Sequence, residues 1–258
     1  MKRLFLKYLP FGTILFACLA AIFFSVAFLR SYDESVANYF ARGSLMPVLA
    51  LVFAGLAFAV GIVSACLRDL PSVPSAPLWS FAPAFVAFIL AAIVFFPTQT
   101  VGGILLLTGT VFALLMMIPF CRLKVDLPVI AGFFALAGMI DLIATYYFDM
   151  TLEMNAPLKI SVQMGLLCAM LYLTVEFRSL LGRTVPRLFL ILTALFLAVG
   201  SLPAFSVILA FLSGKTNYRS YVAGGILTLG LFLTACIRLI QLMFSEKETN
   251  GPTESEEA

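Results

Sequence analysis

Histidine is absent from this 258-residue sequence, and charged residues make up only 11% of it. The missing histidines remove the commonest metal ligand and the usual general base near neutral pH. Soluble domains are about a quarter charged, so this chain has too few polar groups to cover a surface that faces water. A nucleic-acid-binding protein needs a basic stripe on a solvated domain, whereas the bases here lie in short segments between apolar runs. We therefore expect no nucleic-acid partner.

Motifs for catalysis and metal binding are also missing. The sequence has no HExxH, GxSxG or GxxxxGK[ST] motif and no paired carboxylates within an apolar run. No CxxC pair occurs, and the spacing of the five cysteines supports neither a disulfide framework nor a zinc site. We interpret these cysteines as small apolar core residues; they are Cys18, Cys66, Cys121, Cys168 and Cys236. The sequence therefore favours a protein that is not an enzyme, with no catalytic residue, cofactor or metal.

Long apolar runs dominate what is present, because hydrophobic residues make up 62% of the chain. Crossing the hydrocarbon core of a bilayer takes about 20 apolar residues per helix. The runs predict an all-α integral membrane protein, a bundle of about eight transmembrane helices in a single polytopic domain over residues 1–244, with the lipid bilayer as its surroundings. The expected spans are Leu9–Leu29, Leu45–Leu67, Phe81–Phe96, Val101–Phe120, Leu127–Phe148, Pro157–Phe177, Pro186–Leu212 and Tyr221–Phe244.

The two ends of the chain are expected to differ from the spans. Met1–Lys7 is a short basic head, and with the apolar run that follows it could pass for a signal peptide. That run is longer than a signal core of about 7–15 residues, so we interpret it as a retained first span, with cleavage as the alternative. Residues 245–258 are polar, acidic and without an apolar face, which predicts a disordered cytoplasmic tail.

The segment Ser31–Gly43 predicts a short helix lying on the outer membrane surface. Ser31 and Glu34 have the spacing of a capping box, and Gly43 is placed to end the helix. Aromatic and apolar residues recur at helical spacing on one face; they are Tyr32, Val36, Tyr39 and Phe40.

Charge distribution predicts the orientation of the bundle. Eight spans place both termini on one side of the membrane, and basic residues concentrate on the cytoplasmic side. With the N-terminus inside, eleven of the 16 lysines and arginines are inner and five are outer; the outer five are Arg30, Arg42, Lys159, Lys215 and Arg219. We therefore predict a multi-pass protein of the cell (plasma) membrane with both termini cytoplasmic. The short loops are typical of a bacterial inner membrane protein.

One carboxylate lies inside an apolar run. Asp141 belongs to the span Leu127–Phe148, and a charged group at that depth is costly unless something specific holds it. Asp141 and Thr145 continue a stripe of small residues that ends at Gly138, so Asp141 is expected beside the packing face of its helix. Lys159 and Gln163 lie one turn apart on the next span. The sequence predicts an intramembrane polar cluster that opens outward; its members are Asp141, Thr145, Lys159 and Gln163.

The role of this cluster stays open between two readings. Asp141 could be structural, held by a lysine or a few hydroxyls, or it could line a wet cavity and bind a cation or relay a proton.

Pro203 predicts a kink in the seventh span, because proline removes a helix hydrogen bond. Arg178, Arg183 and Arg187 form a candidate inner basic patch: a gate, a partner-docking patch or a phospholipid headgroup site, or simply ordinary anchoring at the inner leaflet.

Three classes of function remain. Permease-like movement of a small solute or ion is favoured by the kinked span, the glycine-rich helices and the intramembrane acid. A non-catalytic sensor, assembly factor or partner subunit is the alternative, which would bring a membrane protein partner or a homo-oligomer. A membrane-embedded enzyme is the third.

Overall fold

The computed structural model describes residues 2–33, 39–67, 73, 78–118, 126–183, 185–214 and 219–245. Nearly all of them are helical, and the remainder includes a two-stranded antiparallel ladder. The elements are α1 (Lys2–Ser31), β1 (Tyr32–Asp33), β2 (Tyr39–Phe40), α2 (Leu45–Leu67), η1 (Leu78–Phe81), α3 (Ala82–Phe95), α4 (Thr100–Met117), α6 (Asp126–Phe148), α7 (Pro157–Leu180), α8 (Pro186–Leu212) and α9 (Arg219–Ser245).

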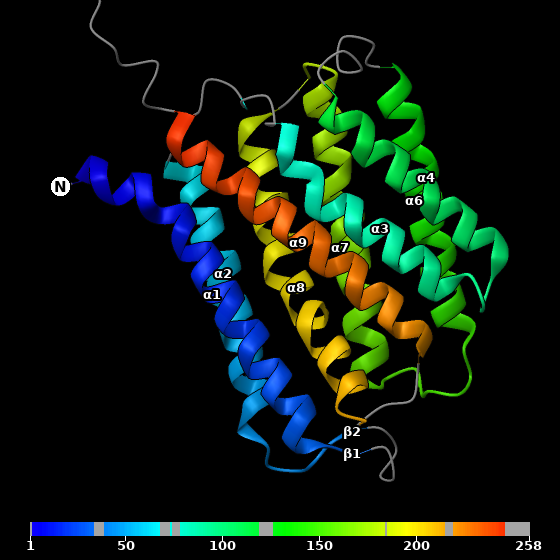
Figure 1. The fold of residues 1–258 in the computed structure, drawn as a ribbon. Coiled ribbons are helices and arrows are strands. Elements are labelled where there is room, and N and C mark those ends of the chain that lie inside the picture. Colours follow the sequence, from blue (N-terminus) through cyan, green and yellow to red (C-terminus); the bar gives the residue numbers. More distant parts are fainter. Residues whose placement is uncertain are drawn as a thin grey trace, which may run out of the picture.

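Successive helices run in alternating directions through one bundle (Figure 1). The start of α1 and the end of α9 lie at the same end of the bundle, which we call the terminal end. The β1–β2 ladder lies at the opposite end, which we call the hairpin end.

Length and composition suit most of these helices to a bilayer. Seven of them are long and apolar enough to cross a membrane, and an eighth apolar helix, Trp79–Phe95, is shorter. The shorter helix was expected from the sequence, because its apolar run was the briefest of the eight. These features make the chain a multi-pass membrane protein with an all-helical bundle, as predicted.

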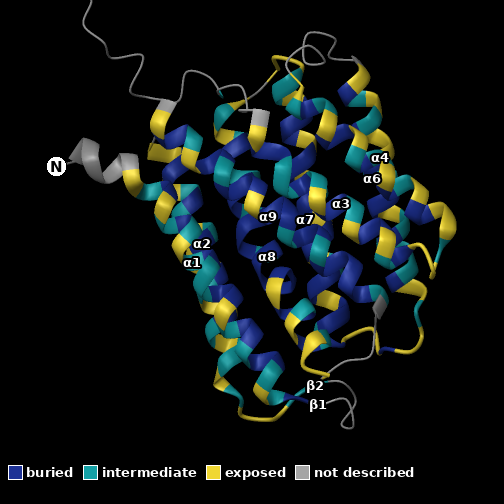
Figure 2. Ribbon diagram, viewed as in Figure 1, coloured by how far each residue is buried: buried dark blue, intermediate teal, exposed yellow. Residues whose placement is uncertain are grey.

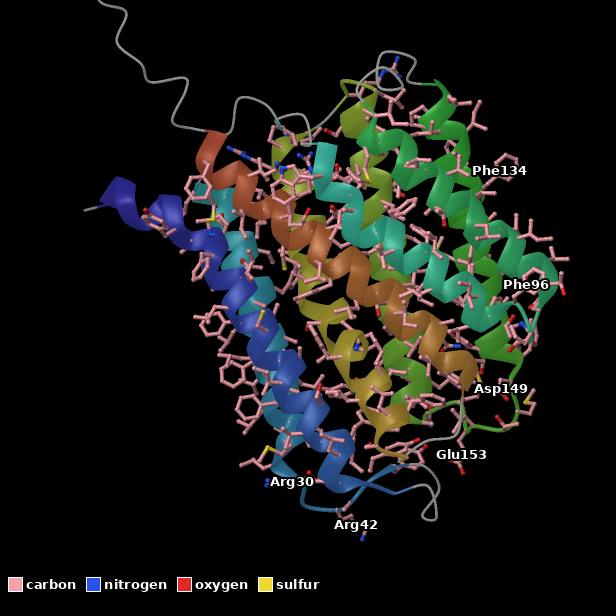
Figure 3. All side chains as sticks on the ribbon, in the orientation of Figure 1. Arg30, Arg42, Phe96, Phe134, Asp149 and Glu153 are labelled. Carbon is pink, nitrogen blue, oxygen red and sulfur yellow. The ribbon has the colours of Figure 1, made fainter. Side chains whose placement is uncertain are left out.

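Burial divides the bundle into a centre and a periphery. The apolar stretches of α7, α8 and α9 are mostly buried, whereas those of α2 and α6 are mostly open to the surroundings (Figure 2). The open surface is apolar along the sides of the bundle, where Phe96 and Phe134 lie (Figure 3). Charged side chains such as Arg30 and Glu153 lie at the hairpin end (Figure 3). This arrangement puts hydrocarbon against lipid and charge against water.

The predicted surface helix over Ser31–Gly43 is wrong. Its two ends form β1 and β2, in which Tyr32 pairs with Phe40, and the residues between them lie outside the described part. A chain reversal allows Phe40 to pack edge-on against Phe28, with ring centroids 5.1 Å apart. The spacing that favoured a helix also fits this reversal, and aromatic residues pack well in strands.

Glycines bring several helices into direct backbone contact. A Cβ built on Gly230 of α9 would lie 2.2 Å from the Cβ of Ala87 and 2.6 Å from the carbonyl oxygen of Pro83, both in α3. A Cβ on Gly138 of α6 would meet the α4 backbone at Leu105 at 2.9 Å. Small residues permit this close approach in membrane bundles, so the small stripe that ends at Gly138 packs as predicted.

The predicted tail cannot be followed in the structure, because residues 246–258 lie outside the described part of the chain.

Candidate functional site

Three charged side chains are completely enclosed in the described part of the chain: Lys159, Glu176 and Arg238, each at most 1% exposed. Two of them lie on α7 near its opposite ends, and the third lies on α9. Charged groups at membrane depth are costly unless they are paired or hydrogen-bonded. Their partners therefore define the candidate sites.

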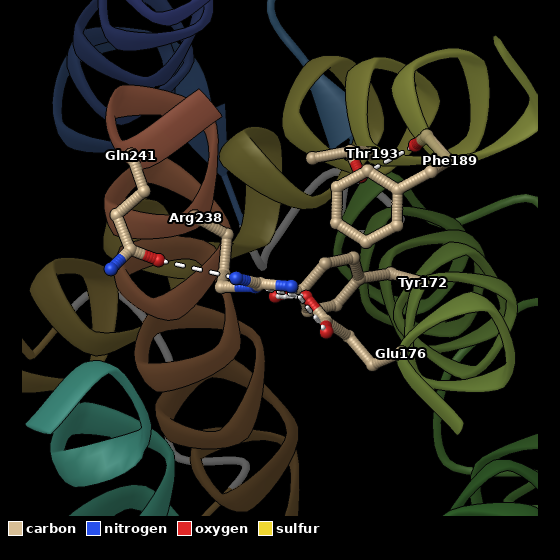
Figure 4. Close-up of polar contacts among 6 residues, drawn as sticks. All are labelled: Tyr172, Glu176, Phe189, Thr193, Arg238 and Gln241. Atoms are coloured by element: carbon tan, nitrogen blue, oxygen red, sulfur yellow. Dashed lines mark hydrogen bonds and ion pairs between the residues drawn. The ribbon is translucent and has the colours of Figure 1, made fainter. Parts of the chain in front are cut away.

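Glu176 and Arg238 form a bidentate ion pair between α7 and α9 (Figure 4). The guanidinium Nε donates to Glu176 Oε1 at 2.9 Å, and Nη2 donates to Oε2 at 3.2 Å. This paired geometry is the strong form of the arginine–carboxylate interaction. At about 1.5 Å per residue, Arg238 lies roughly 10 Å inside the terminal end of α9.

Neighbouring side chains complete the surroundings of the pair. Tyr172, one turn before Glu176 on α7, donates its hydroxyl to Glu176 Oε1 at 2.9 Å. Arg238 Nη1 donates to Gln241 Oε1 at 3.2 Å, and the guanidinium carbon lies 5.5 Å from the centroid of the Phe189 ring on α8. Three central helices therefore meet at this ion pair, which we call the Glu176–Arg238 site.

Sequence reasoning missed this pairing. No partner was predicted for Glu176, and Arg238 was counted only among the inner basic residues. The signal was present, because Arg238 interrupts the apolar run Tyr221–Phe244 about two turns before its end. An isolated base and an isolated acid at the same end of two spans predict a pair.

Asp141 has different partners from those predicted. Gln99, which directly precedes α4, donates its side-chain amide to Asp141 Oδ1 at 3.0 Å. Thr145 donates to Gln99 Oε1 at 2.6 Å and to the carbonyl oxygen of Asp141 at 2.9 Å. Asp141 therefore joins α6 to the turn between α3 and α4.

The second carboxylate oxygen of Asp141 is enclosed and has no hydrogen-bond partner among the described residues. It faces the first turn of α4, since a Cβ on Gly102 would lie 2.1 Å from it. The first turn of a helix carries a partial positive charge, which favours a carboxylate at this position. Glycine at residue 102 leaves the space that the carboxylate occupies.

The predicted cluster is divided in the structure. The Lys159 ammonium group donates to the backbone carbonyl oxygens of Asp149 at 2.7 Å and Leu152 at 3.4 Å, and so holds the loop that follows α6. The amide nitrogen of Gln163 is enclosed without a partner in the described part. No hydrogen bond there joins Lys159 or Gln163 to Asp141, so Asp141 and Thr145 form one group and Lys159 belongs to another.

The remaining predicted residues lie in the following places. Pro203 is buried within α8, which is helical throughout, and a Cβ on Gly165 of α7 would meet its ring at 2.6 Å. Arg178, Arg183 and Arg187 are exposed at the terminal end, around the connection between α7 and α8. The kink and the role of this basic patch stay predictions.

Comparison with known proteins adds no identity. The chain matches no protein-family model, no curated protein and no solved structure. The function must therefore be inferred from the sites themselves.

Replacing Asp141 with alanine is expected to lower the free energy of unfolding by about 1.5–3 kcal/mol, the range for hydrogen bonds to charged groups. Asp141→Asn should lose less, because its carbonyl oxygen can still accept from Gln99. Unfolding of the purified protein in mixed detergent micelles measures both changes. If Asp141→Ala is as stable as the unsubstituted protein, Asp141 does not stabilise the contact between α6 and the α3–α4 turn.

Proposed function

We propose that this protein is a permease that moves a small solute or ion through its helix bundle. The Glu176–Arg238 site carries the proposal, because it places an acid and a base between the central helices, near the terminal end, fully enclosed and paired with each other. Replacing such a pair with apolar residues is often neutral or stabilising, so stability alone does not account for it. Intramembrane ionisable residues that face a bundle interior typically mark substrate or ion pathways.

The position of α7 supports a pathway along this helix. Lys159 is held by loop carbonyls near the hairpin end of α7, and Glu176 is held by Arg238 near the terminal end. The two residues are about 25 Å apart along the helix. Each end of α7 is thus held to its neighbours by a contact of a buried charged residue. This arrangement is expected when the two ends of the bundle open separately.

Contacts in the middle of α7 are compatible with movement. Gly165 lies against the ring of Pro203, where α8 lacks one backbone donor, and against Thr228 of α9. Because Gly165 has no side chain, nothing on α7 interlocks with α8 at this contact, and the two helices can shift without repacking a side chain.

We further propose that the terminal end faces the cytoplasm of a bacterial cell and that the protein resides in its inner membrane. The exposed arginines of the basic patch lie at this end, and basic residues favour the cytoplasmic side. Asp149 and Glu153 lie at the hairpin end (Figure 3).

A membrane partner subunit is the second candidate, and one observation favours it. On α2, Gly55 and Ala59 are one turn apart and exposed, and nothing lies within 4 Å of a Cβ built on Gly55. Small residues at this spacing allow two membrane helices to approach closely. An embedded enzyme has no comparable observation in its favour in the described part of the chain.

Transport can be measured without knowing the substrate. Proteoliposomes containing the full chain are tested with protons, using the dye pyranine inside, with Na⁺ and K⁺, and with glycerol and urea by osmotic swelling. We expect faster flux of at least one probe than in protein-free vesicles, and a changed rate in Glu176→Gln. Arg42→Gln, which removes an exposed charge from the hairpin end, should behave like the unsubstituted protein.

Absence of flux for every probe, with correctly folded protein in the vesicles, would contradict the permease. A dimer of the purified protein that Gly55→Leu separates would then favour the subunit.

A further inference from the structure

The hydroxyl of Tyr146 bonds to two backbone groups in the first turns of α9, a contact that we call the Tyr146 insertion. Tyr146, on α6, donates to the carbonyl oxygen of Ser220 at 2.7 Å and accepts from the backbone N–H of Gly224 at 3.1 Å. These two backbone groups are four residues apart, so in a regular helix they bond to each other. Helices bend where a side chain enters this ladder.

Packing around Tyr146 fixes the hydroxyl at this point. Its ring stacks on Tyr221 with centroids 4.5 Å apart and planes 16° apart. A Cβ on Gly224 would lie 2.4 Å from Val162 of α7 and 3.1 Å from the Tyr146 hydroxyl. Glycine at residue 224 therefore leaves room for Val162 and for a close approach of the Tyr146 hydroxyl.

The other end of α9 is held differently. Arg238 ties it to α7 through Glu176, and this is the one ion pair with both partners enclosed among the described residues. Between the two ends, Gly230 rests directly on the α3 backbone at Pro83. Close-packed interiors transmit strain, so we expect α3 to follow a movement of α9.

We infer that α9 is the moving helix of the bundle, which pivots at the Tyr146 insertion near the hairpin end and opens at the terminal end when the Glu176–Arg238 pair separates. The inference rests on the proposed permease function, because an opening of this kind serves to admit a solute. With the pair closed, α7 and α9 are held together at the terminal end. With the pair separated, the side of α7 that carries Cys168, Tyr172 and Glu176 becomes reachable from that end.

The natural cysteine at position 168 reports this opening. Cys168 is 5% exposed and lies two turns before Glu176 on the same side of α7. A full-length chain that keeps Cys168 and has serine at the other four cysteines is placed in proteoliposomes. A membrane-impermeant methanethiosulfonate reagent is then added on the side of the terminal end.

We expect Glu176→Gln to label Cys168 at least about tenfold faster than the unsubstituted pair, because the separated form becomes more populated. Leu181→Ala, at an exposed position of the same end, should leave labelling unchanged. Ser64→Cys, made in a chain without Cys168, provides the control for unfolding, since Ser64 is 2% exposed on α2 and away from α7.

The outcomes separate cleanly. Faster labelling at Cys168 with slow labelling at the Ser64→Cys thiol supports the inference. Unchanged labelling at Cys168, or equal acceleration at both positions, overturns it, because the pair then either does not control an opening or holds the whole bundle.

The pivot has its own test. Tyr146→Phe keeps the stacked ring and removes the hydroxyl, so the Gly224 N–H can bond directly to Ser220. We expect this change, added to Glu176→Gln, to slow Cys168 labelling several-fold, and an unchanged rate would remove Tyr146 from the mechanism. Cys168 labelling does not depend on transport, so the two proposals can fail separately. Faster labelling in Glu176→Gln without flux of any probe would contradict the permease alone. Flux without faster labelling would contradict the moving helix alone.

Discussion

Replacing Arg238 with alanine is expected to lower the free energy of unfolding by about 3–5 kcal/mol, the cost of removing one partner from a buried ion pair. Among the described residues, the change leaves the enclosed Glu176 carboxylate with only the Tyr172 hydroxyl donating to it. It also removes the guanidinium from the Phe189 ring. Equilibrium unfolding in mixed micelles, monitored by circular dichroism, measures the difference.

Arg183→Ala provides the matched control. Arg183 is exposed at the same end of the bundle, and substitutions at exposed positions usually change stability by less than about 0.5 kcal/mol. If both arginine variants lose the same small amount, the ion pair does not hold α7 to α9.

Replacing Gly230 with alanine is expected to cost about 3 kcal/mol, the upper part of the range for overpacked sites. The added methyl group would lie 2.6 Å from the Pro83 carbonyl oxygen, a backbone atom that cannot rotate away. Helices α3 and α9 must then separate along their contact. Unfolding in micelles measures the loss, and a lower yield of folded protein should accompany it.

Gly55→Ala is the control for this second prediction. A Cβ there meets nothing within 4 Å, and alanine favours helix over glycine by up to about 1 kcal/mol. We therefore expect equal or slightly higher stability. A Gly230→Ala variant as stable as Gly55→Ala would contradict the direct backbone contact between α3 and α9.

Much of the fold could be predicted because a bilayer requires long apolar helices, and the length of each apolar run can be read directly from the sequence. The span Pro186–Leu212 has the bounds of α8, and Leu45–Leu67 has those of α2. The β1–β2 ladder could not be predicted in the same way. It depends on Phe40 reaching back to Phe28, a contact between segments that local periodicity does not record.

The candidate sites were predicted less well, for a reason that Asp141 illustrates. Its depth and its place beside the packing face followed from the sequence. Its partner did not, because pairing depends on which helix lies alongside: α6 packs mainly against α4, which brings Gln99 to Asp141, and less against α7, which carries Lys159. The same limit hid the contact between Glu176 and Arg238, which come from helices separated in the chain by all of α8.

A double-mutant cycle on Glu176 and Arg238 measures most directly whether this ion pair couples α7 to α9. The single variants Glu176→Leu and Arg238→Met and the double variant are unfolded under the same conditions. The structure predicts that each single change is strongly destabilising and that the double variant loses about 2–3 kcal/mol less than the sum of the two single losses, which is the coupling energy. Additive losses with a coupling energy near zero would contradict an ion pair between α7 and α9.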